Sequence, residues 1–297
     1  MTTPLRAALD GISGILVTPF DADDQIAPAR LAPIVDRAVS AGVHVLVANG
    51  NTGEYFSLQA AEAEAMVYAA AEHIGGRVPL LGGVGRSVNE ACSLARASRR
   101  AGAAGLMVHQ PQDPFVAPRG VVDYVRRIAD AGDGLPVMLY LRNETIGLDA
   151  IEALCRLPLV AGVKWASPTP LLLAEAIRRT ADLDLAWVDG LAEIWTPPFY
   201  AVGARGFTSG LINVAPAHSV KIHAALARAD YPEASRLIGA MQAFEALRAH
   251  ERNGANVSVV KAALQLRGED CGAARPPAAW PVAPDDMEEL RALLKAW

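Results

Sequence analysis

Lys164 is the residue of the sequence whose surroundings best fit covalent chemistry. It lies inside an apolar run, Val160-Ala-Gly-Val-Lys-Trp165, in a chain with four lysines among its 27 Lys and Arg residues. Burial in an apolar strand disfavours the charged form of a lysine and lowers its pKa. A neutral amine attacks ketones to form an iminium, or Schiff base. The alternative is a structural lysine paired with a buried carboxylate, for which Asp189 and Glu54 are the candidates.

Tyr140 ends the apolar run that precedes the one with Lys164. Neighbouring strands of a sheet lie about 4.8 Å apart, so the Tyr140 hydroxyl can approach the Lys164 amine if both side chains face inward. A phenol at that place can relay protons while a Schiff base forms and turns over. The alternative is a core tyrosine whose hydroxyl reaches water.

A glycine-containing loop, residues 50–54 (Gly-Asn-Thr-Gly-Glu), follows the second apolar run. Glycines let the backbone come close to a ligand, and free N–H groups at the start of a helix bind anions. We therefore expect the backbone of this loop, with the Thr52 hydroxyl, to form a cradle for a carboxylate. An ordinary turn is the alternative interpretation of the same residues.

Two further polar residues after apolar runs have both a functional and a structural interpretation. His109 can act as a general base or bind substrate, but a lone histidine at a strand end is also typical of a hydrogen-bonded wall residue. Arg142 can bind a distal carboxylate, but loop arginines are often solvated or paired. The six histidines are scattered along the chain, so we expect no metal, and no cofactor besides the covalent iminium on Lys164.

The bulk composition excludes several classes of protein. The 297 residues carry a net charge of −5 without a Lys/Arg cluster, so we expect neither nucleic acid nor a membrane surface as a partner. No apolar run approaches about 18 residues, which argues against a membrane span or a signal peptide. Three cysteines without a CxxC pair fit a reducing compartment. We expect a soluble, cytoplasmic protein.

Chemistry at several strand ends requires a scaffold that brings these ends together, and the repeats of the sequence predict one. Eight apolar runs begin near residues 12, 43, 78, 105, 135, 160, 184 and 205, with helix-forming stretches between them. Near-continuous apolar strands are typical of a parallel sheet covered on both faces. Eight such units predict an α/β fold, a (β/α)8 TIM barrel, whose functional residues lie at the carboxyl ends of the strands.

The pattern changes after the eighth apolar run. The sequence then predicts helices without strands, at about 217–250, 257–266 and 285–297. We interpret residues 1–216 as the barrel and residues 217–297 as a C-terminal helical extension packed on it, in one structural unit. No Gly-x-Gly-x-x-Gly motif opens the first helix, which argues against a dinucleotide-binding fold.

Six short motifs follow one another along the chain. They are Thr18-Pro19-Phe20, residues 50–54, Gly82-Gly83-Val84-Gly85, Leu139-Tyr140, Gly162-Val163-Lys164 and Gly206-Phe207-Thr208-Ser209-Gly210. In order and spacing they resemble the dihydrodipicolinate synthase/N-acetylneuraminate lyase superfamily over essentially the whole chain.

The resemblance implies a (β/α)8 barrel that assembles as a homotetramer or homodimer and carries out class I aldolase-type chemistry. It implies that Lys164 forms a Schiff base with pyruvate or another 2-oxo acid, and that Tyr140 relays protons. We expect the residues that bind the substrate to be Gly50, Asn51, Thr52, His109, Arg142 and Gly210.

Three positions depart from the synthase branch of this superfamily. Asn51 stands where that branch has the first of two threonines, and residues 109–112 (His-Gln-Pro-Gln) lack the tyrosine that reaches a neighbouring subunit. Thr145 stands where the branch has an arginine for the aldehyde substrate. These departures argue against the lysine-pathway synthase reaction.

Other residues resemble a second branch, the 5-dehydro-4-deoxyglucarate dehydratases. Residues 53–58 (Gly-Glu-Tyr-Phe-Ser-Leu) are similar to a stretch of those enzymes, and Arg142-Asn143 follows the tyrosine as an arginine does there. Trp165-Ala166 departs from the Asp-Gly that follows the lysine in this branch. Trp165 either narrows the site or packs outward between helices.

Several functions therefore stay open. The main hypothesis is a lyase or aldolase that acts on a 2-oxo acid through Lys164. The alternatives are a dehydratase of a 2-keto-3-deoxy sugar acid, dihydrodipicolinate synthase itself, and a non-catalytic binding protein on the same barrel. The presence of both Lys164 and Tyr140 favours an enzyme, because a binding protein does not need a buried reactive amine.

Overall fold

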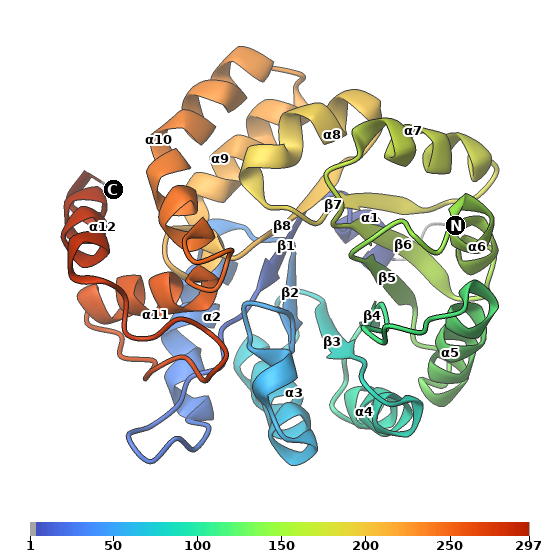
Figure 1. The fold of residues 1–297 in the computed structure, drawn as a ribbon, viewed down its shortest axis with the longest axis horizontal. Helices are drawn as coiled ribbons and strands as arrows, with labels where there is room; N and C mark the ends of the chain where they lie inside the picture. Colours follow the sequence, from blue (N-terminus) through green and yellow to red (C-terminus); the bar gives the residue numbers. More distant parts are fainter. Residues whose placement is uncertain (1–3, 297) are drawn as a thin grey trace.

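A closed barrel of eight parallel strands forms the centre of the computed structural model, which describes residues 4–296 (Figure 1). Each strand pairs with the next along the chain, and β8 pairs with β1. The (β/α)8 barrel predicted from the sequence is confirmed. Residues 1–3 and Trp297, the ends of the two predicted units, lie outside the described residues. The strands are β1 (Ile12–Ile15), β2 (Val45–Ala48), β3 (Leu80–Val84), β4 (Gly105–His109), β5 (Val137–Leu141), β6 (Val160–Trp165), β7 (Ala186–Asp189) and β8 (Gly206–Ser209).

Helices surround the barrel, with short 3-10 turns in some of the loops (Figure 1). The helices are α1 (Pro4–Ala8), α2 (Ala32–Ala41), α3 (Ala60–Ile74), α4 (Val88–Arg100), α5 (Pro118–Ala131), α6 (Leu148–Cys155), α7 (Pro170–Arg179), α8 (Thr196–Val202), α9 (Pro216–Ala227), α10 (Tyr231–Ala249), α11 (Asn256–Leu266) and α12 (Pro284–Ala296). The 3-10 turns are η1 (Pro28–Leu31), η2 (Tyr55–Ser57), η3 (Glu193–Trp195) and η4 (Leu211–Asn213).

Successive side chains of each strand point alternately into the barrel and toward the helices. The buried apolar residues accordingly form two clusters, a smaller one that includes Val47, Met138 and Tyr140 and a larger one between strands and helices. Trp165 belongs to the larger cluster, and its Nε1 donates to Thr169 Oγ1 at 3.3 Å. It therefore packs outward and does not narrow the barrel mouth, while its neighbour Lys164 points inward.

The C-terminal helices gather on one side of the barrel, in orange and red in Figure 1. Helix α9 packs against α2, so the ring of helices closes, and α10 then packs on α9 and α11 on α10. The helices α9 to α12 occupy the segments predicted to be helical, with α9 and α10 together covering the first of them. The division of the chain into units at residue 216 stays a prediction. None of the helices among residues 4–296 has the length and apolarity needed to cross a membrane.

A buried ion pair ties these C-terminal helices to the loop after β2. The Nζ of Lys261, on α11, lies 2.6 Å from Oε1 of Glu54, and both side chains are almost fully buried. The other Glu54 oxygen accepts the backbone N–H of Arg275 at 2.7 Å. Burial raises the pKa of Glu54 and lowers the pKa of Lys261, so each charge depends on the other to stay in the interior.

Replacing Lys261 with methionine should therefore destabilise the fold strongly. The Lys261→Met variant leaves the Glu54 carboxylate buried without its cation, which costs about 3 kcal/mol in free energy of unfolding. The matched Glu54→Gln/Lys261→Met variant keeps an acceptor for the Arg275 N–H and should recover more than half of that loss. Urea unfolding of the three proteins measures both effects. A double variant as unstable as Lys261→Met would contradict the prediction.

Candidate active site

The pairing of β5 with β6 brings Tyr140 and Lys164 together. The two residues are direct partners in the strand register, and the Lys164 Nζ lies 3.9 Å from the centre of the Tyr140 ring. Both line a cavity of about 410 Å³ at the carboxyl ends of the strands. Lys164 is only 3% exposed, so the amine sits at the floor of a cleft and is shielded from bulk water.

The environment of Lys164 favours its neutral form. Burial is the main cause that lowers the pKa of Lys164 to about 7, the Arg142 cation lowers it further, and Asp189 opposes both. Among residues 4–296, Lys164 makes no ion pair, since Glu54 is bound to Lys261 and Asp189 acts on the amine only through its field. The structural interpretation of Lys164 as the partner of a carboxylate is therefore not supported.

The amide side chain of Asn51 holds Tyr140, at the position where the synthase branch has a threonine hydroxyl. The Nδ2 of Asn51 donates to the Tyr140 hydroxyl at 2.9 Å. Burial raises the pKa of Tyr140, so its phenol keeps its proton at neutral pH. Because the amide N–H occupies a lone pair of the phenol oxygen, the phenol proton stays available to a group in the cavity.

The loop after β2 presents free donors to the cavity. Asn51 and Thr52 line its wall, and neither their backbone N–H groups nor the Thr52 hydroxyl bonds to any residue within 4–296. Thr18 anchors the loop from behind, because its hydroxyl donates to the Gly53 carbonyl at 2.7 Å. Three unpaired donors on a rigid loop are suited to a carboxylate.

Gly50, predicted to bind substrate, lies behind the wall of this cavity. A Cβ on Gly50 would stand 2.4 Å from Cγ2 of Ile15, so this position has to be glycine for the loop to pack on β1. Gly210, at the end of β8, does line the cavity. A Cβ there would stand 2.6 Å from Nη2 of Arg248 and 3.2 Å from Oγ1 of Thr52. Gly210 thus leaves room for these two polar groups.

His109 also lies behind the wall and not in it. It is 1% exposed, its Nε2 donates to the Asn49 carbonyl at 2.9 Å, and its ring stacks on Tyr55 at 4.8 Å. Burial lowers the pKa of His109 to about 3, so the ring is neutral. The geometry fits the structural interpretation of His109, as a hydrogen-bonded residue that supports the Tyr140 ring, whose centre is 5.1 Å away.

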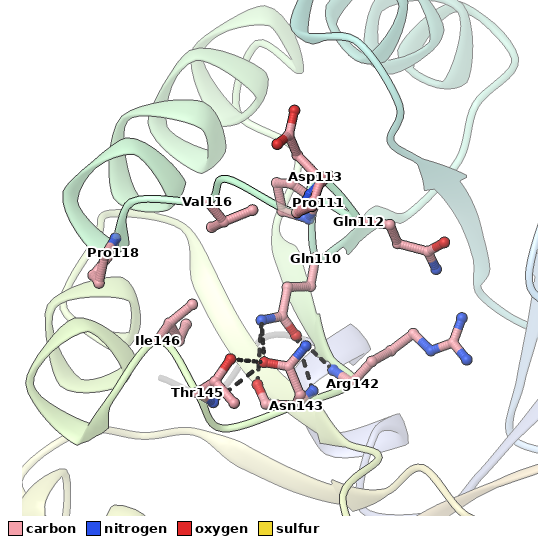
Figure 2. A pocket seen from close by; sticks show the side chains of 11 residues that line it. Gln110, Pro111, Gln112, Asp113, Val116, Pro118, Arg142, Asn143, Thr145 and Ile146 are labelled. Carbon is pink, nitrogen blue, oxygen red and sulfur yellow. Dashed lines mark hydrogen bonds between the residues drawn. The ribbon is translucent and has the colours of Figure 1, made fainter.

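Arg142 lies on the loop after β5. Its exposed side chain lines the cavity with Lys164 and also a second cavity of about 520 Å³, between the loops after β4 and β5 (Figure 2). Gln110 fixes this loop, because its Oε1 accepts the backbone N–H of Arg142 at 2.7 Å and of Asn143 at 3.1 Å. Thr145 lines only the second cavity and bonds to Asn143.

Five residues from the C-terminal region complete the wall, and the sequence analysis missed them. They come from the end of α10, the turn after it and the beginning of α11: Glu245, Arg248, Ala249, Asn253 and Asn256. One signal was present in the sequence. On α10, the residues Leu237, Met241 and Phe244 are buried at helical spacing, and Arg248 continues this apolar face. An arginine on the buried face of a helix is unusual and indicates a specific partner.

No cluster of three or more His, Cys, Asp or Glu side chains that could hold a metal occurs in the part of the chain that the structure describes. The donors around Lys164 are amides, hydroxyls and cations, which are suited to an organic anion. The absence of a metal or another cofactor stays a prediction.

Comparisons with known proteins agree with this geometry. The family model described as the dihydrodipicolinate synthetase family matches residues 8–297. A 5-dehydro-4-deoxyglucarate dehydratase of Pseudomonas putida is 29% identical over 96% of this chain and 95% of its own length. An uncharacterized DapA-like lyase of Halobacterium salinarum is 32% identical over 91% of this chain and 88% of its own.

The solved structures that the chain resembles have the same barrel. The crystal structure of dihydrodipicolinate synthase from Bacillus clausii superposes with a TM-score of 0.94, at 34% sequence identity and with 99% of both chains covered. The match extends over the barrel and the C-terminal helices alike. The chain therefore belongs to the dihydrodipicolinate synthetase family and is an enzyme of the lyase class.

Proposed function

We propose that the enzyme forms a Schiff base between Lys164 and a 2-oxo acid. The observation that carries this proposal is the amine of Lys164, buried, without an ion pair and with a pKa near neutrality, beside a phenol and the donors of Asn51 and Thr52. The amine attacks the carbonyl carbon, the oxygen takes a proton, and the hydroxyl then leaves as water to give the iminium. The loop donors hold the carboxylate next to this carbon.

Tyr140 supplies the proton that the leaving hydroxyl needs. Its phenol O–H faces the cavity, and the Asn51 amide that donates to the phenol oxygen stabilises the phenolate left behind. The same phenolate then takes a proton from the carbon next to the iminium, or from a hydroxyl one carbon further. One tyrosine thus serves as acid and as base in succession.

The iminium is an electron sink that supports two outcomes. If the carbon next to it loses a proton, the enamine formed can expel a hydroxyl from the following carbon as water, which is a dehydration. If that hydroxyl loses its proton instead, the bond between the two carbons breaks, which is an aldol cleavage. The relative named 5-dehydro-4-deoxyglucarate dehydratase supports dehydration of a 2-keto-3-deoxy sugar acid as the second candidate.

Dihydrodipicolinate synthase activity has less support from the site. Thr145 faces only the second cavity and bonds to Asn143, so it offers no cation to an aldehyde substrate beside Lys164. Arg142 is the cation on that side of the mouth. The anionic group at the far end of a 2-oxo acid can pair with Arg142, so no cation is needed at position 145.

Borohydride reduction in the presence of pyruvate should attach the 2-oxo acid irreversibly to Lys164. We expect one adduct per chain, located on the peptide that contains Lys164 by mass spectrometry. The Lys164→Arg variant should lose the adduct, while Lys221→Arg, a change of an exposed lysine outside the cavity, should keep it. A folded wild-type protein without an adduct from any 2-oxo acid would falsify the Schiff-base proposal.

The rate of adduct formation should rise with pH and level off above about 7. Below the pKa of Lys164, about 7, the amine is protonated and has no lone pair for attack; above this pKa it is neutral. Arg142→Gln removes a cation that lowers this pKa, so the midpoint should move to higher pH, whereas Arg142→Lys should leave it in place. Stopped-flow trapping across pH 5 to about 9.5 measures the midpoint, and an unchanged midpoint in Arg142→Gln would refute the role of Arg142.

Tyr140→Phe should slow turnover by about 100-fold while the KM for the 2-oxo acid changes little. The reason is that the phenol moves protons but does not hold the carboxylate. Tyr200→Phe is the control, since that buried tyrosine donates to the Arg205 carbonyl away from the cavity and should keep full turnover. Equal loss of kcat in both variants would point to a general structural effect.

A further inference from the structure

The wall of the cavity that contains Lys164 is divided by polarity. On the side of β6 and β7, the lining side chains are almost all apolar: Ala166, Pro168, Leu191, Ala192, Ile194 and Trp195. On the side of the C-terminal helices they are Glu245, Arg248, Ala249, Asn253 and Asn256, all polar except Ala249. Beyond the donors of the loop after β2, Tyr140 and Arg142, the polar side chains of this wall come from Thr208 and from the junction of α10 and α11.

The polar side is centred on a buried pair of charges. Arg248 is 5% exposed and Glu245 10%, and Nη1 of Arg248 contacts Oε1 of Glu245 directly. Nη2 of Arg248 donates to Oδ1 of Asn256 at 2.9 Å, while its Nε is buried and has no partner among the described residues. The buried Nε does not open on the cavity, which the cluster lines through Glu245, Arg248, Asn253 and Asn256.

The backbone between α10 and α11 is strained where it reaches the cavity. Glu251, Arg252 and Asn253 have φ angles of 52°, 57° and 69°, three successive non-glycine residues in the left-handed region. Each such residue costs free energy that the surrounding structure must supply, and such strain is common at binding sites. This left-handed turn reverses the chain so that Asn253 and Asn256 both face the cavity.

The charges of this junction decide which groups it can bind. Glu245 already neutralises Arg248, so the pair offers donors and acceptors without net charge, and the two amides add both kinds. Such a surface fits hydroxyl groups, which donate and accept, better than a second carboxylate. Arg142, which has no ion pair within 4–296, is the site for a terminal anion instead.

We propose that Glu245, Arg248, Asn253 and Asn256 form a hydroxyl-binding subsite, which selects 2-oxo acids that carry hydroxyl groups on the chain beyond the carbonyl. The inference rests on the Schiff-base function proposed for Lys164 and names the substrate class of the same cavity. It assigns specificity to the C-terminal helices, while the chemistry stays with the barrel strands.

The test compares two six-carbon 2-oxo acids, 2-keto-3-deoxygluconate and 2-oxohexanoate, which differ in their hydroxyl groups. The concentration that gives half-maximal borohydride trapping on Lys164 is measured for each, with pyruvate as the reference. In the wild-type enzyme, 2-keto-3-deoxygluconate should half-saturate at a concentration at least about tenfold lower than 2-oxohexanoate. In Glu245→Leu/Arg248→Met, which removes both charges together, this preference should disappear.

The outcomes separate this proposal from the Schiff-base function. A wild-type enzyme that traps pyruvate but shows no preference for the hydroxylated acid overturns the subsite alone, as does a double variant that keeps the preference. Failure to trap any 2-oxo acid, pyruvate included, overturns the function of Lys164 and the subsite with it.

A second pair of variants tests the subsite without removing buried charges. Asn253→Gly and Arg252→Gly both place glycine at a left-handed position, but only Asn253 lines the cavity. Asn253→Gly should reduce the preference for 2-keto-3-deoxygluconate about fivefold, while Arg252→Gly should keep it. Equal preferences in the two variants would show that the strained backbone, and not the Asn253 amide, determines selectivity, and would refute the proposal.

Discussion

The cradle loop after β2 and the C-terminal helices meet at the buried ion pair between Glu54 and Lys261. The pair fixes two walls of one cavity relative to each other: the donors expected to hold a carboxylate and the helices that carry Arg248. Burial works against both charges, so their contact has to be kept for the cavity to keep its shape.

The chain thus contains two buried lysines in opposite electrostatic surroundings. Glu54, 2.6 Å from the Lys261 amine, favours the charged form of that lysine, whereas Lys164 has a tyrosine ring beside it and an arginine nearby, and its pKa falls to about 7. Burial alone does not make a lysine reactive; the absence of a carboxylate in contact does. This distinction depends on the tertiary neighbours of each lysine, which lie far away in the sequence.

Much of the barrel and the centre of the site could be predicted from the sequence. Apolar runs with glycine breaks indicated all eight strands, and the register of β5 and β6 brings Tyr140 to Lys164 as expected. Lys261 also lies in an apolar stretch, but nothing in the sequence pairs it with Glu54. The positions of Gly50 and His109 behind the wall depend on side-chain packing, which the sequence does not show. Arg248 and Glu245 have the i, i+3 spacing of an ordinary surface pair, so the sequence does not mark them as buried. Assembly into a homotetramer or homodimer, and the cytoplasmic location, stay predictions.

The hydrogen bonds that Gln110 accepts from backbone N–H groups of the loop after β5 (Figure 2) have an evolutionary consequence. The position of the Arg142 guanidinium depends on a side chain from a different loop, so the effect of any exchange at residue 142 depends on which residue occupies position 110. The two sites are epistatic: a change at either one alters the fitness cost of a change at the other.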